Sequence, residues 1–519
     1  MLLQGPRPGG AEGGAATATA ARFLSRHALL LVVGIGALVR FATLASQDYW
    51  FDEYLSVGII QLGPGEIIDR TIGNDTSPPL YFLIAAGWER VFGTGEVALR
   101  SLSALFGTAT IPIAYAAGVA LGSRRAGLFA AALTASSPLM IWYSQEARPY
   151  ALFALLSTIS FLCFVHALNG RGRGWLGGWV AASVLALGTH YFAIFLIVAE
   201  AAWLLWRSVG ARRSAAIAIA IVSAAGLALL AIAAERAELA GWIAGIDFSD
   251  RVLQVPQHFV VGLNTPWEAL APVATVATLL VAFRALLRAE AETRRIVAVA
   301  GSVTLIGTGM PLAAPLLNAD YLLSRNLIGL WAPAAIALAA LLAAPQVDRL
   351  RRPAPNRLGA ATAAALCVGG LAIAVWTAAT PAAGRPDWGE LARGLGPAQV
   401  KRVIASEHYQ TRPFGPHLDA SQDLVFRVQT PASELDVIDF RKTTDYGVGP
   451  CWWGAGCGGS PATAPVRAPR GFALVDEGAT PLFEYRRYRA REPRLLPPPD
   501  AGCAHPRNCR ILEAWVQWP

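Results

Sequence analysis

Two adjacent acids, Asp52 and Glu53, are the first residues of this chain whose types and position point to chemistry. They lie in the stretch DYWFDEYLSVG, residues 48–58, directly after the first apolar run. A carboxylate beside lipid is costly and is usually kept for chemistry or for a partner. Neighbours in a helix point about 100° apart, so the two acids would not share one face. The plain alternative is a solvated helix cap beside a membrane span.

Further ionisable side chains stand in short turns between later apolar runs. They are Glu146 and Arg148 in SQEARPY, His190 in GTHYF, and Asp320 and Arg325 in NADYLLSRN. Each alone is more often an interfacial cap or a snorkelling side chain than a site residue. If all of them lay on one side of the membrane, they would indicate a substrate path, because ionisable residues at membrane depth are rare and usually functional.

These residue types suit the transfer of a group from a phosphate carrier. One carboxylate could accept the proton of an attacking hydroxyl or amine from a distance of about 3 Å. Arg148 and Arg325 could bind the donor phosphate and stabilise it as it departs. His190 could be a metal ligand or a substrate contact, and a purely structural hydrogen bond is an equal alternative.

The composition is that of a polytopic membrane protein. The chain has 519 residues, of which 54% are hydrophobic and 15% charged, against about 25% charged in a soluble protein. Its apolar residues form blocks of about 17 to 25 residues, the length of a membrane-spanning helix. We therefore predict an all-α membrane domain of about eleven transmembrane helices. They are expected at 27–46, 96–121, 126–143, 149–168, 175–189, 191–206, 214–234, 266–283, 296–317, 326–344 and 358–379.

The arginines predict how the chain is oriented. Lys401 and Lys442 are the only lysines, and the pI is near 9.4. A nucleic-acid partner would explain a basic chain, but arginines scattered through short gaps between apolar runs are what the positive-inside rule produces. The arginine-rich gaps all fall on one side when the spans are followed in order. We expect a multi-pass plasma-membrane protein with a cytoplasmic N-terminus and an extracytoplasmic C-terminus. The gaps are 22–26, 124–125, 171–173, 207–213, 284–295 and 349–357.

Three regions follow from this division. Residues 1–26, rich in Gly, Ala, Pro and Thr, are expected to be a disordered cytoplasmic N-terminus. Residues 27–379 form the transmembrane domain, and its first outer loop, 47–95, carries the two opening acids. Within that loop, 79–93 is too short to span and is expected to lie as a helix on the outer surface. Residues 380–519 are expected to form a small extracytoplasmic domain of α/β or irregular structure.

The cysteines favour disulfides in this C-terminal domain. Four of the six cysteines lie there, and an even set outside the cytoplasm suggests two disulfides with three possible pairings. A zinc site is the alternative, with His505 as an extra ligand. Cys163 and Cys367 lie in predicted spans and are expected to be packing residues. The four candidates are Cys451, Cys457, Cys503 and Cys509.

Several stretches of the chain, taken in order, resemble the GT-C glycosyltransferases. They are FDE after the first apolar run, NDTSPPLYFL at 74–83, FGTGEVALRSLSALFG at 92–107 and SPLMIWYSQEARPYAL at 137–152. The chain is most similar to the branch that holds the protein O-mannosyltransferases and aminoarabinose transferases, glycosyltransferase family 39 and its neighbours. The resemblance covers roughly residues 25 to 345, and the C-terminal domain shows no motif of the family.

The resemblance implies a reaction and roles for the acids. Such enzymes move a sugar from a polyprenyl-phosphate carrier to an acceptor on the outer side, with inversion. It implies that Asp52 is the general base, that Glu146 helps to build the same site beside Glu53, and that a divalent metal ion sits near these acids in some relatives. The chain departs from the family in having no lysine near the PP pair and in having Glu146 where many relatives have aspartate. The acceptor could be a protein, a glycan or a lipid.

Two other classes of protein remain open from the residues alone. A transporter or lipid flippase could also place acids and a histidine near one membrane face. Transporters usually show internal repeats with paired interrupted helices, and no repeat relates the two halves of this chain. A scaffold that only presents the C-terminal domain would need no acids in the outer loops. A membrane glycosyltransferase is therefore the favoured interpretation.

Overall fold

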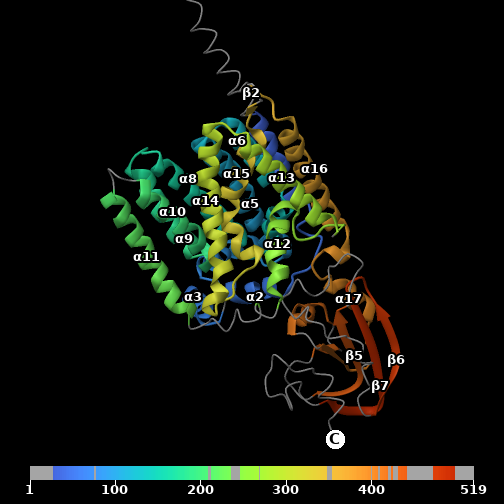
Figure 1. Ribbon diagram of the computed structural model, residues 1–519. Coiled ribbons are helices and arrows are strands. Elements are labelled where there is room, and N and C mark those ends of the chain that lie inside the picture. The colour runs from blue at the N-terminus through green and yellow to red at the C-terminus, as the bar shows by residue number, and fades with distance from the viewer. Residues whose placement is uncertain are drawn as a thin grey trace, which may run out of the picture.

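The chain folds into a bundle of long helices that carries a small β-sheet at one end (Figure 1). The structure is a computed structural model. The structure describes residues 27–74, 77–207, 212–234, 243, 246–267, 269–347, 353–398, 400–406, 409–418, 422–424, 430–440 and 471–496. The predicted N-terminal segment 1–26 and the four cysteines of the C-terminal domain lie outside the described residues.

Every predicted span coincides with helical structure. By length and composition, seven segments among the described residues could cross a membrane, and an eighth is a pair of helices bent by 58°. The seven segments are α5 (Glu96–Leu121), α8 (Tyr150–Leu168), α11 (Arg212–Ala234), α13 (Leu270–Leu287), α14 (Ala291–Ala313) with η3 (Ala314–Leu317), η4 (Ser324–Leu330) with α15 (Trp331–Ala343), and α16 (Arg357–Ala379). The multi-pass membrane class is thus confirmed, with fewer full-length spans than the expected eleven.

The remaining predicted spans are bent or short. The bent pair is α6 (Arg124–Ser136) and α7 (Pro138–Ser144), and the bend falls at Pro138, which lacks the N–H that a continuous helix would use. The first predicted span is the helix His27–Phe41. The other two are α9 (Arg173–Leu187), of 15 residues, and α10 (Ile194–Arg207), of 14 residues.

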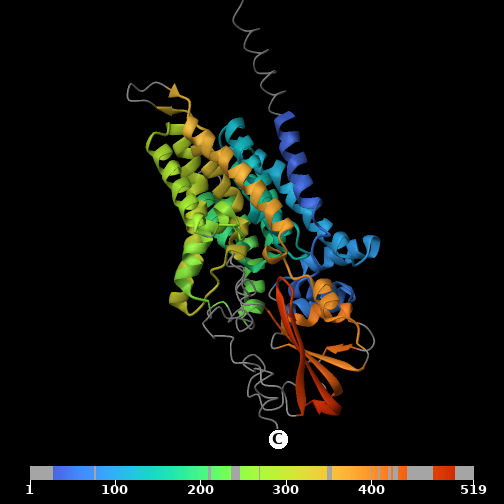
Figure 2. The ribbon, with the colours of Figure 1, turned by 90° about the vertical axis from the view of Figure 1, so that its right-hand side faces the viewer.

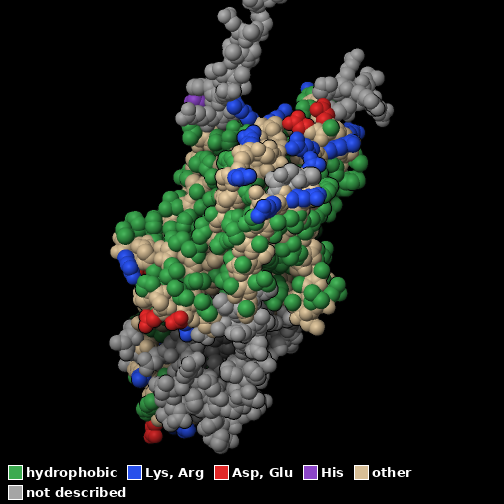
Figure 3. Space-filling view, turned by 90° about the vertical axis from the view of Figure 1, so that its left-hand side faces the viewer, with side chains coloured by type: hydrophobic (Ala, Val, Ile, Leu, Met, Phe, Trp, Pro, Cys, Tyr) green, Lys and Arg blue, Asp and Glu red, His purple; other side chains and the backbone are tan. Residues whose placement is uncertain are grey.

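Hydrophobic side chains form a broad belt across one face of the bundle. Figure 3 shows this belt, with Lys and Arg side chains gathered mainly at the end away from the sheet. At that end Arg295, near the start of α14, donates to Asn169, which follows α8, so two of the predicted arginine-rich gaps are neighbours. The short hairpin of β1 (Gln346–Val347) and β2 (Pro353–Ala354) lies at the same end (Figure 1).

Short helices occupy the opposite end of the bundle. The first outer loop contains α2 (Phe51–Ile60), α3 (Pro64–Asn74) and α4 (Leu80–Phe92), and α12 (Phe248–Val261) follows later in the chain. The predicted surface helix at 79–93 is thus helical; it buries Tyr81 and Phe82 and contacts α2 and α5. Its position relative to a membrane surface stays a prediction.

The C-terminal part is an α/β structure attached to this end (Figure 2). Its five-stranded sheet has the order β4-β3-β5-β7-β6, in which β3 is parallel to β4 and β5 and the other pairs are antiparallel. Its elements are η5 (Pro381–Ala383), α17 (Trp388–Leu395), β3 (Arg402–Ser406), η6 (Tyr409–His417), β4 (Gln422–Leu424), β5 (Thr430–Phe440), β6 (Phe472–Ala479) and β7 (Phe483–Leu496).

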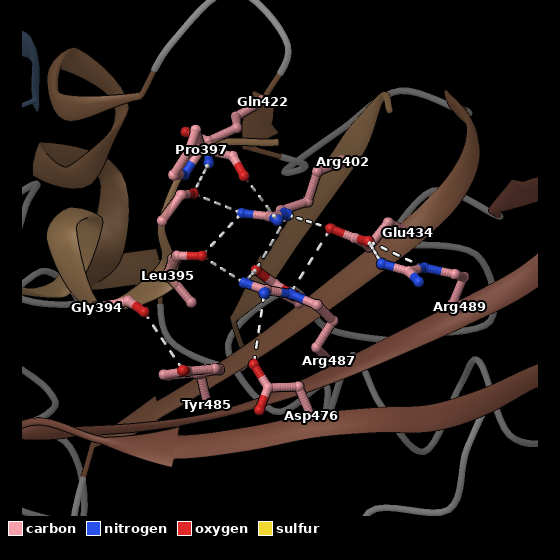
Figure 4. Close-up of polar contacts among 12 residues, drawn as sticks. Gly394, Leu395, Pro397, Arg402, Gln422, Glu434, Asp476, Tyr485, Arg487 and Arg489 are labelled. Atoms are coloured by element: carbon pink, nitrogen blue, oxygen red, sulfur yellow. Dashed lines mark hydrogen bonds and ion pairs between the residues drawn. The ribbon is translucent and has the colours of Figure 1, made fainter. Parts of the chain in front are cut away.

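A network of ion pairs joins α17 to this sheet (Figure 4). Glu434 and Asp436 are two residues apart on β5, so both carboxylates reach the same face, and both are buried. Arg402 donates to Glu434 at 2.6 Å, and Arg487 donates to Asp436 at 2.8 and 2.9 Å. The same two arginines also donate to the carbonyl of Leu395 at the end of α17. The network therefore fixes α17 against the sheet.

The two cysteines of the predicted spans are free, as expected. Cys163 in α8 is buried and Cys367 in α16 is half-buried.

Candidate active site

Six of the seven ionisable residues singled out in the sequence gather in one cluster at the end of the bundle that carries the sheet. Asp52 and Glu53 come from the first turn of α2, and Glu146 and Arg148 from the turn between α7 and α8. The other two are His190, just before η1 (Tyr191–Ala193), and Arg325 in η4. Residues as far apart in the chain as Asp52 and Arg325 thus form one cluster.

Glu53 is a buried structural anchor. Its side chain is 0% exposed, and both of its oxygens accept from Arg100, at 2.8 and 2.7 Å. It also accepts from the backbone N–H of Ala147 at 2.8 Å and from that of Trp50 at 3.3 Å. Burial raises its pKa, but Arg100, Arg385 and the backbone N–H of Ala147 together outweigh burial and hold the pKa of Glu53 below its usual range. These contacts join α2 to α5 and to the turn that carries Glu146.

Arg100 was not predicted as a site residue. It is 1% exposed, and its five N–H groups donate to Glu53 and to the carbonyls of Leu44, Gln47 and Asp48. It therefore holds the segment that leads into α2. The one signal in the sequence was an arginine inside the otherwise apolar beginning of a predicted span, in EVALRSLSAL.

Asp52 is the accessible acid of the cluster. Its side chain is 24% exposed, and Arg325 Nη1 lies 3.9 Å from one carboxylate oxygen. The guanidinium of Arg325 also lies over the ring of Tyr150, 6.0 Å from its centroid. Asp52 is therefore partly exposed to solvent and lies beside a cation.

Glu146 is buried beside a cation that the sequence did not predict. It is 1% exposed, and Arg385 Nη2 donates to its Oε2 at 3.3 Å, while its Oε1 is buried without a hydrogen bond within the described part of the chain. Burial raises the pKa of Glu146 to about 7, although Arg385 opposes that shift. Arg385 also lies 3.9 Å from Glu53 and stacks on Trp142, 4.2 Å from the ring centroid. Because Arg385 follows α16 and belongs to no motif, no local pattern pointed to it.

Arg148 and His190 line the same cluster. Arg148 is 4% exposed; it donates to Ser56 Oγ at 3.3 Å and lies over the ring of Phe82. His190 stacks on Phe153 with a ring-centroid distance of 4.8 Å, and its Nδ1 accepts from the N–H of Phe192 at 3.4 Å. Burial, with Arg148 and Arg325 nearby, lowers the pKa of His190 to about 3, so the ring is neutral.

The contacts of His190 fit the structural alternative better than a metal ligand. Within the residues that the structure describes, no group of three or more His, Cys, Asp or Glu side chains could hold a metal ion. Asp320, the other acid of the later turn, is paired elsewhere: Arg251 of α12 donates to both of its oxygens, at 2.6 and 2.5 Å.

The balance of charge in the cluster favours an anionic ligand. Four guanidinium groups face three carboxylates, so one positive charge remains even when every acid is ionised. A pocket opens beside the cluster and is lined by polar groups that include Gln47, Gln145, Asn264, Thr377 and Arg385. The groups that count toward the charge are Arg100, Arg148, Arg325 and Arg385, and Asp52, Glu53 and Glu146.

Comparisons with known proteins agree with this architecture. The family model for dolichyl-phosphate-mannose-protein mannosyltransferases matches residues 76–235. The structure of ArnT from Cupriavidus metallidurans in the apo state matches with a TM-score of 0.52 at 12% identity, and that of ArnT bound to undecaprenyl phosphate with 0.50 at 12% identity. Each match covers 88% of this chain and 97% of the ArnT chain. No curated protein sequence matches.

The fold of this chain is therefore similar to that of ArnT, and residues 76–235 match the mannosyltransferase family model.

Proposed function

We propose that this chain moves a sugar from a polyprenyl-phosphate carrier to an acceptor on the extracytoplasmic side of the plasma membrane. The excess positive charge of the cluster suits the phosphate of such a carrier. The likeness to ArnT, which has been solved with undecaprenyl phosphate bound, supports a donor of this kind. The similarity of the fold to that of ArnT supports the glycosyltransferase over the transporter and flippase alternatives.

The observation that carries the mechanism is the accessibility of Asp52. A general base must come within hydrogen-bond reach of the proton that it removes. The side chain of Asp52 is 24% exposed, whereas Glu53 and Glu146 are 0% and 1% exposed and already tied to arginines. We assign Asp52 as the base and Glu53 and Glu146 as acids that shape the site around it.

The proposed reaction is a single displacement. The acceptor hydroxyl or amine gives its proton to the Asp52 carboxylate as its oxygen or nitrogen attacks the anomeric carbon. The bond from that carbon to the phosphate oxygen breaks on the opposite face, which inverts the carbon. The carrier phosphate takes the electron pair and is already a good leaving group, so no general acid is needed.

Arg325 and Arg148 are the proposed phosphate ligands. Arg325 lies 3.9 Å from Asp52, so a phosphate bound to Arg325 would lie near the proposed base. Arg148 reaches the cluster from the neighbouring turn and is 4% exposed, where its charge is little screened.

The test is sugar transfer by the purified full-length protein in lipid nanodiscs. Polyprenyl phosphates carrying labelled hexoses or pentoses are the donors, and a cell-envelope extract supplies acceptors. We expect the protein to release polyprenyl phosphate from at least one donor and the label to appear on an acceptor. Consumption of no donor by protein that is folded, as judged by its melting, would contradict the proposal.

A further inference from the structure

Arg385 occupies an unusual place for a residue outside the helical bundle. It lies between α16 and α17, yet it is 5% exposed and its guanidinium is enclosed by the candidate active site. Nη2 donates to Glu146 Oε2 and to the carbonyl of Trp142, both at 3.3 Å, and Nε lies 3.9 Å from Glu53 Oε2. One cation from the C-terminal part thus bridges two acids of the bundle.

The segment around Arg385 is attached to the residues just before α2. The N–H of Arg385 donates to the side-chain oxygen of Gln47 at 2.8 Å. The indole N–H of Trp388 donates to the carbonyl of Tyr49 at 2.9 Å, and the N–H of Gly389 donates to the carboxylate of Asp48 at 2.8 Å. Three hydrogen bonds therefore connect this segment to residues 47–49, which lead directly to Asp52.

The same segment is continuous with the core of the C-terminal part. Trp388 is 1% exposed, and its ring lies 4.9 Å from that of Phe483 on β7 and 6.1 Å from that of Phe414 in η6. Docking of the sheet, the attachment to residues 47–49 and the position of Arg385 are thus physically linked.

We propose that Arg385 is a positioning residue for sugar transfer, delivered by the C-terminal part to hold Glu146 as a carboxylate, so that the active site is complete only when that part is docked. This inference rests on the proposed function. It assigns a role to the region in which the sequence shows no family motif.

The surroundings of Glu146 explain why Arg385 would matter. Glu146 faces Asp52 and Glu53 from α2, Arg148 from its own turn, Arg325 from η4 and Arg385 from the C-terminal part. Within the described residues, the hydrogen bond from Arg385 is the only one that its carboxylate accepts. Without Arg385, a buried acid would face two other acids, and its pKa would rise above the present value of about 7.

The experiment compares three variants of the full-length protein across a range of pH. Arg385→Gln removes the charge, Arg385→Lys keeps it, and Arg393→Gln is the matched control, since Arg393 is 73% exposed on α17. We expect Arg385→Gln to lower kcat/KM on the order of 10²-fold at pH 7, because a small misplacement of catalytic groups typically costs a factor of this size. Its activity should also recover at a higher pH than that of the parent, with partial rescue by Arg385→Lys and no change for Arg393→Gln.

Chemical rescue separates the missing charge from a misfolded site. Arg385 lines the pocket beside the cluster, so a small guanidinium ion can enter the space left by Arg385→Ala. Added guanidinium at millimolar concentration should raise the activity of Arg385→Ala and leave Arg393→Ala unchanged. A loss of activity with an unshifted pH profile and no rescue would overturn the proposal.

A second readout does not depend on sugar transfer. Infrared titration of the carboxylic-acid band that disappears in Glu146→Gln reports the pKa of Glu146 directly. We expect this band to persist to higher pH in Arg385→Gln than in the parent; an unchanged titration would overturn the inference. If the parent transferred no sugar while the band still shifted, the proposed function would fail and the link between Arg385 and Glu146 would stand.

Discussion

At the scale of single residues, two neighbouring acids have opposite environments. The first turn of α2 turns Glu53 inward against Arg100 and leaves Asp52 partly exposed beside Arg325. This is the outcome expected for consecutive helical residues that point about 100° apart. This geometry supports the proposed roles, in which Glu53 stabilises the fold and Asp52 takes part in the chemistry.

Glu53→Gln should therefore act mainly on stability. The substitution leaves the buried Arg100 without its carboxylate, and breaking a buried ion pair typically costs about 3–5 kcal/mol. The pKa of Glu53 is lowered in the folded protein, so its contribution is present above the unfolded pKa and is lost as pH falls through the folded pKa. Thermal unfolding in nanodiscs should show a clear fall in Tm for Glu53→Gln and almost none for Asp52→Asn. Equal, small shifts would contradict the anchor role.

Glu146 should give the activity a dependence on pH near neutrality. Its pKa is raised to about 7, and the ionised form is the one that pairs with Arg385. Activity should therefore fall as pH drops below about 7. The effect on stability has the opposite sign. Because the folded pKa exceeds the usual 4.5, the stabilising contribution is complete below about pH 4.5 and is lost as pH rises through about 7.

The measurement is kcat/KM against pH for the parent and for Glu146→Gln. The variant carries no titrating group at this position, so the fall near pH 7 should vanish even though its overall rate is lower. A fall at the same pH in Glu146→Gln would assign the titration to another group.

At the scale of elements, the sequence predicted where the helices of the bundle lie better than it predicted how they bend and how the C-terminal part docks on them. Apolar length is a local property, so each predicted run is helical, but length alone did not show the bend at Pro138 or the shortness of α9 and α10. The sequence could predict that Asp52, Glu146, His190 and Arg325 lie at the same end of the bundle, because every second connection between consecutive spans lies at that end.

The arginines that complete the cluster could not be predicted in this way. Arg100 pairs with an acid 47 residues earlier, and Arg385 with one 239 residues earlier. Such pairings depend on how the elements pack, which no local pattern contains. For the same reason, the α/β character of the C-terminal part could be predicted but its docking on α2 could not.

The ion network of the sheet should control the integrity of the C-terminal part. Glu434→Ala would remove the closest acid of Arg402, which is 3% exposed and would keep Asp436 at 3.4 Å, at a cost of about 1–3 kcal/mol. We expect limited proteolysis to cleave this part faster while the helical bundle stays intact. Glu477→Ala is the control, because Glu477 is 68% exposed and its pair with Arg486 is long, at 3.8 Å. Equal cleavage of the two variants would contradict the role given to the network.

At the scale of the whole molecule, the distribution of charge indicates orientation. The arginine-rich end lies away from the sheet, and the candidate site lies at the other end (Figures 1 and 3). If the positive-inside rule holds, the sheet and the site face the extracytoplasmic side, where a polyprenyl-phosphate sugar would be used.

Reporter fusions to the C-terminus of the full chain test this orientation. In a bacterial host, alkaline phosphatase folds only outside the cytoplasm, whereas green fluorescent protein exported through the general secretion route does not fluoresce there. We expect high phosphatase activity and no fluorescence from fusions expressed at equal levels. The reverse pattern would place the site on the cytoplasmic side and remove the basis for the proposed donor.

The central claim is that Asp52 removes the proton of the acceptor. Asp52→Asn keeps the shape and a hydrogen-bonding group but cannot accept a proton at neutral pH. General-base catalysis is typically worth about 10²- to 10⁴-fold in rate. The matched control is Asp69→Asn, since Asp69 is an exposed acid of α3 in the same outer loop.

The decisive measurement is the rate of sugar transfer by purified Asp52→Asn, Asp69→Asn and the parent, with Tm and expression matched. The account predicts that Asp52→Asn loses roughly 10²- to 10⁴-fold in kcat while its donor still binds, and that Asp69→Asn retains the parent rate. A rate for Asp52→Asn within about threefold of the parent would show that Asp52 only caps α2 and that the base lies elsewhere.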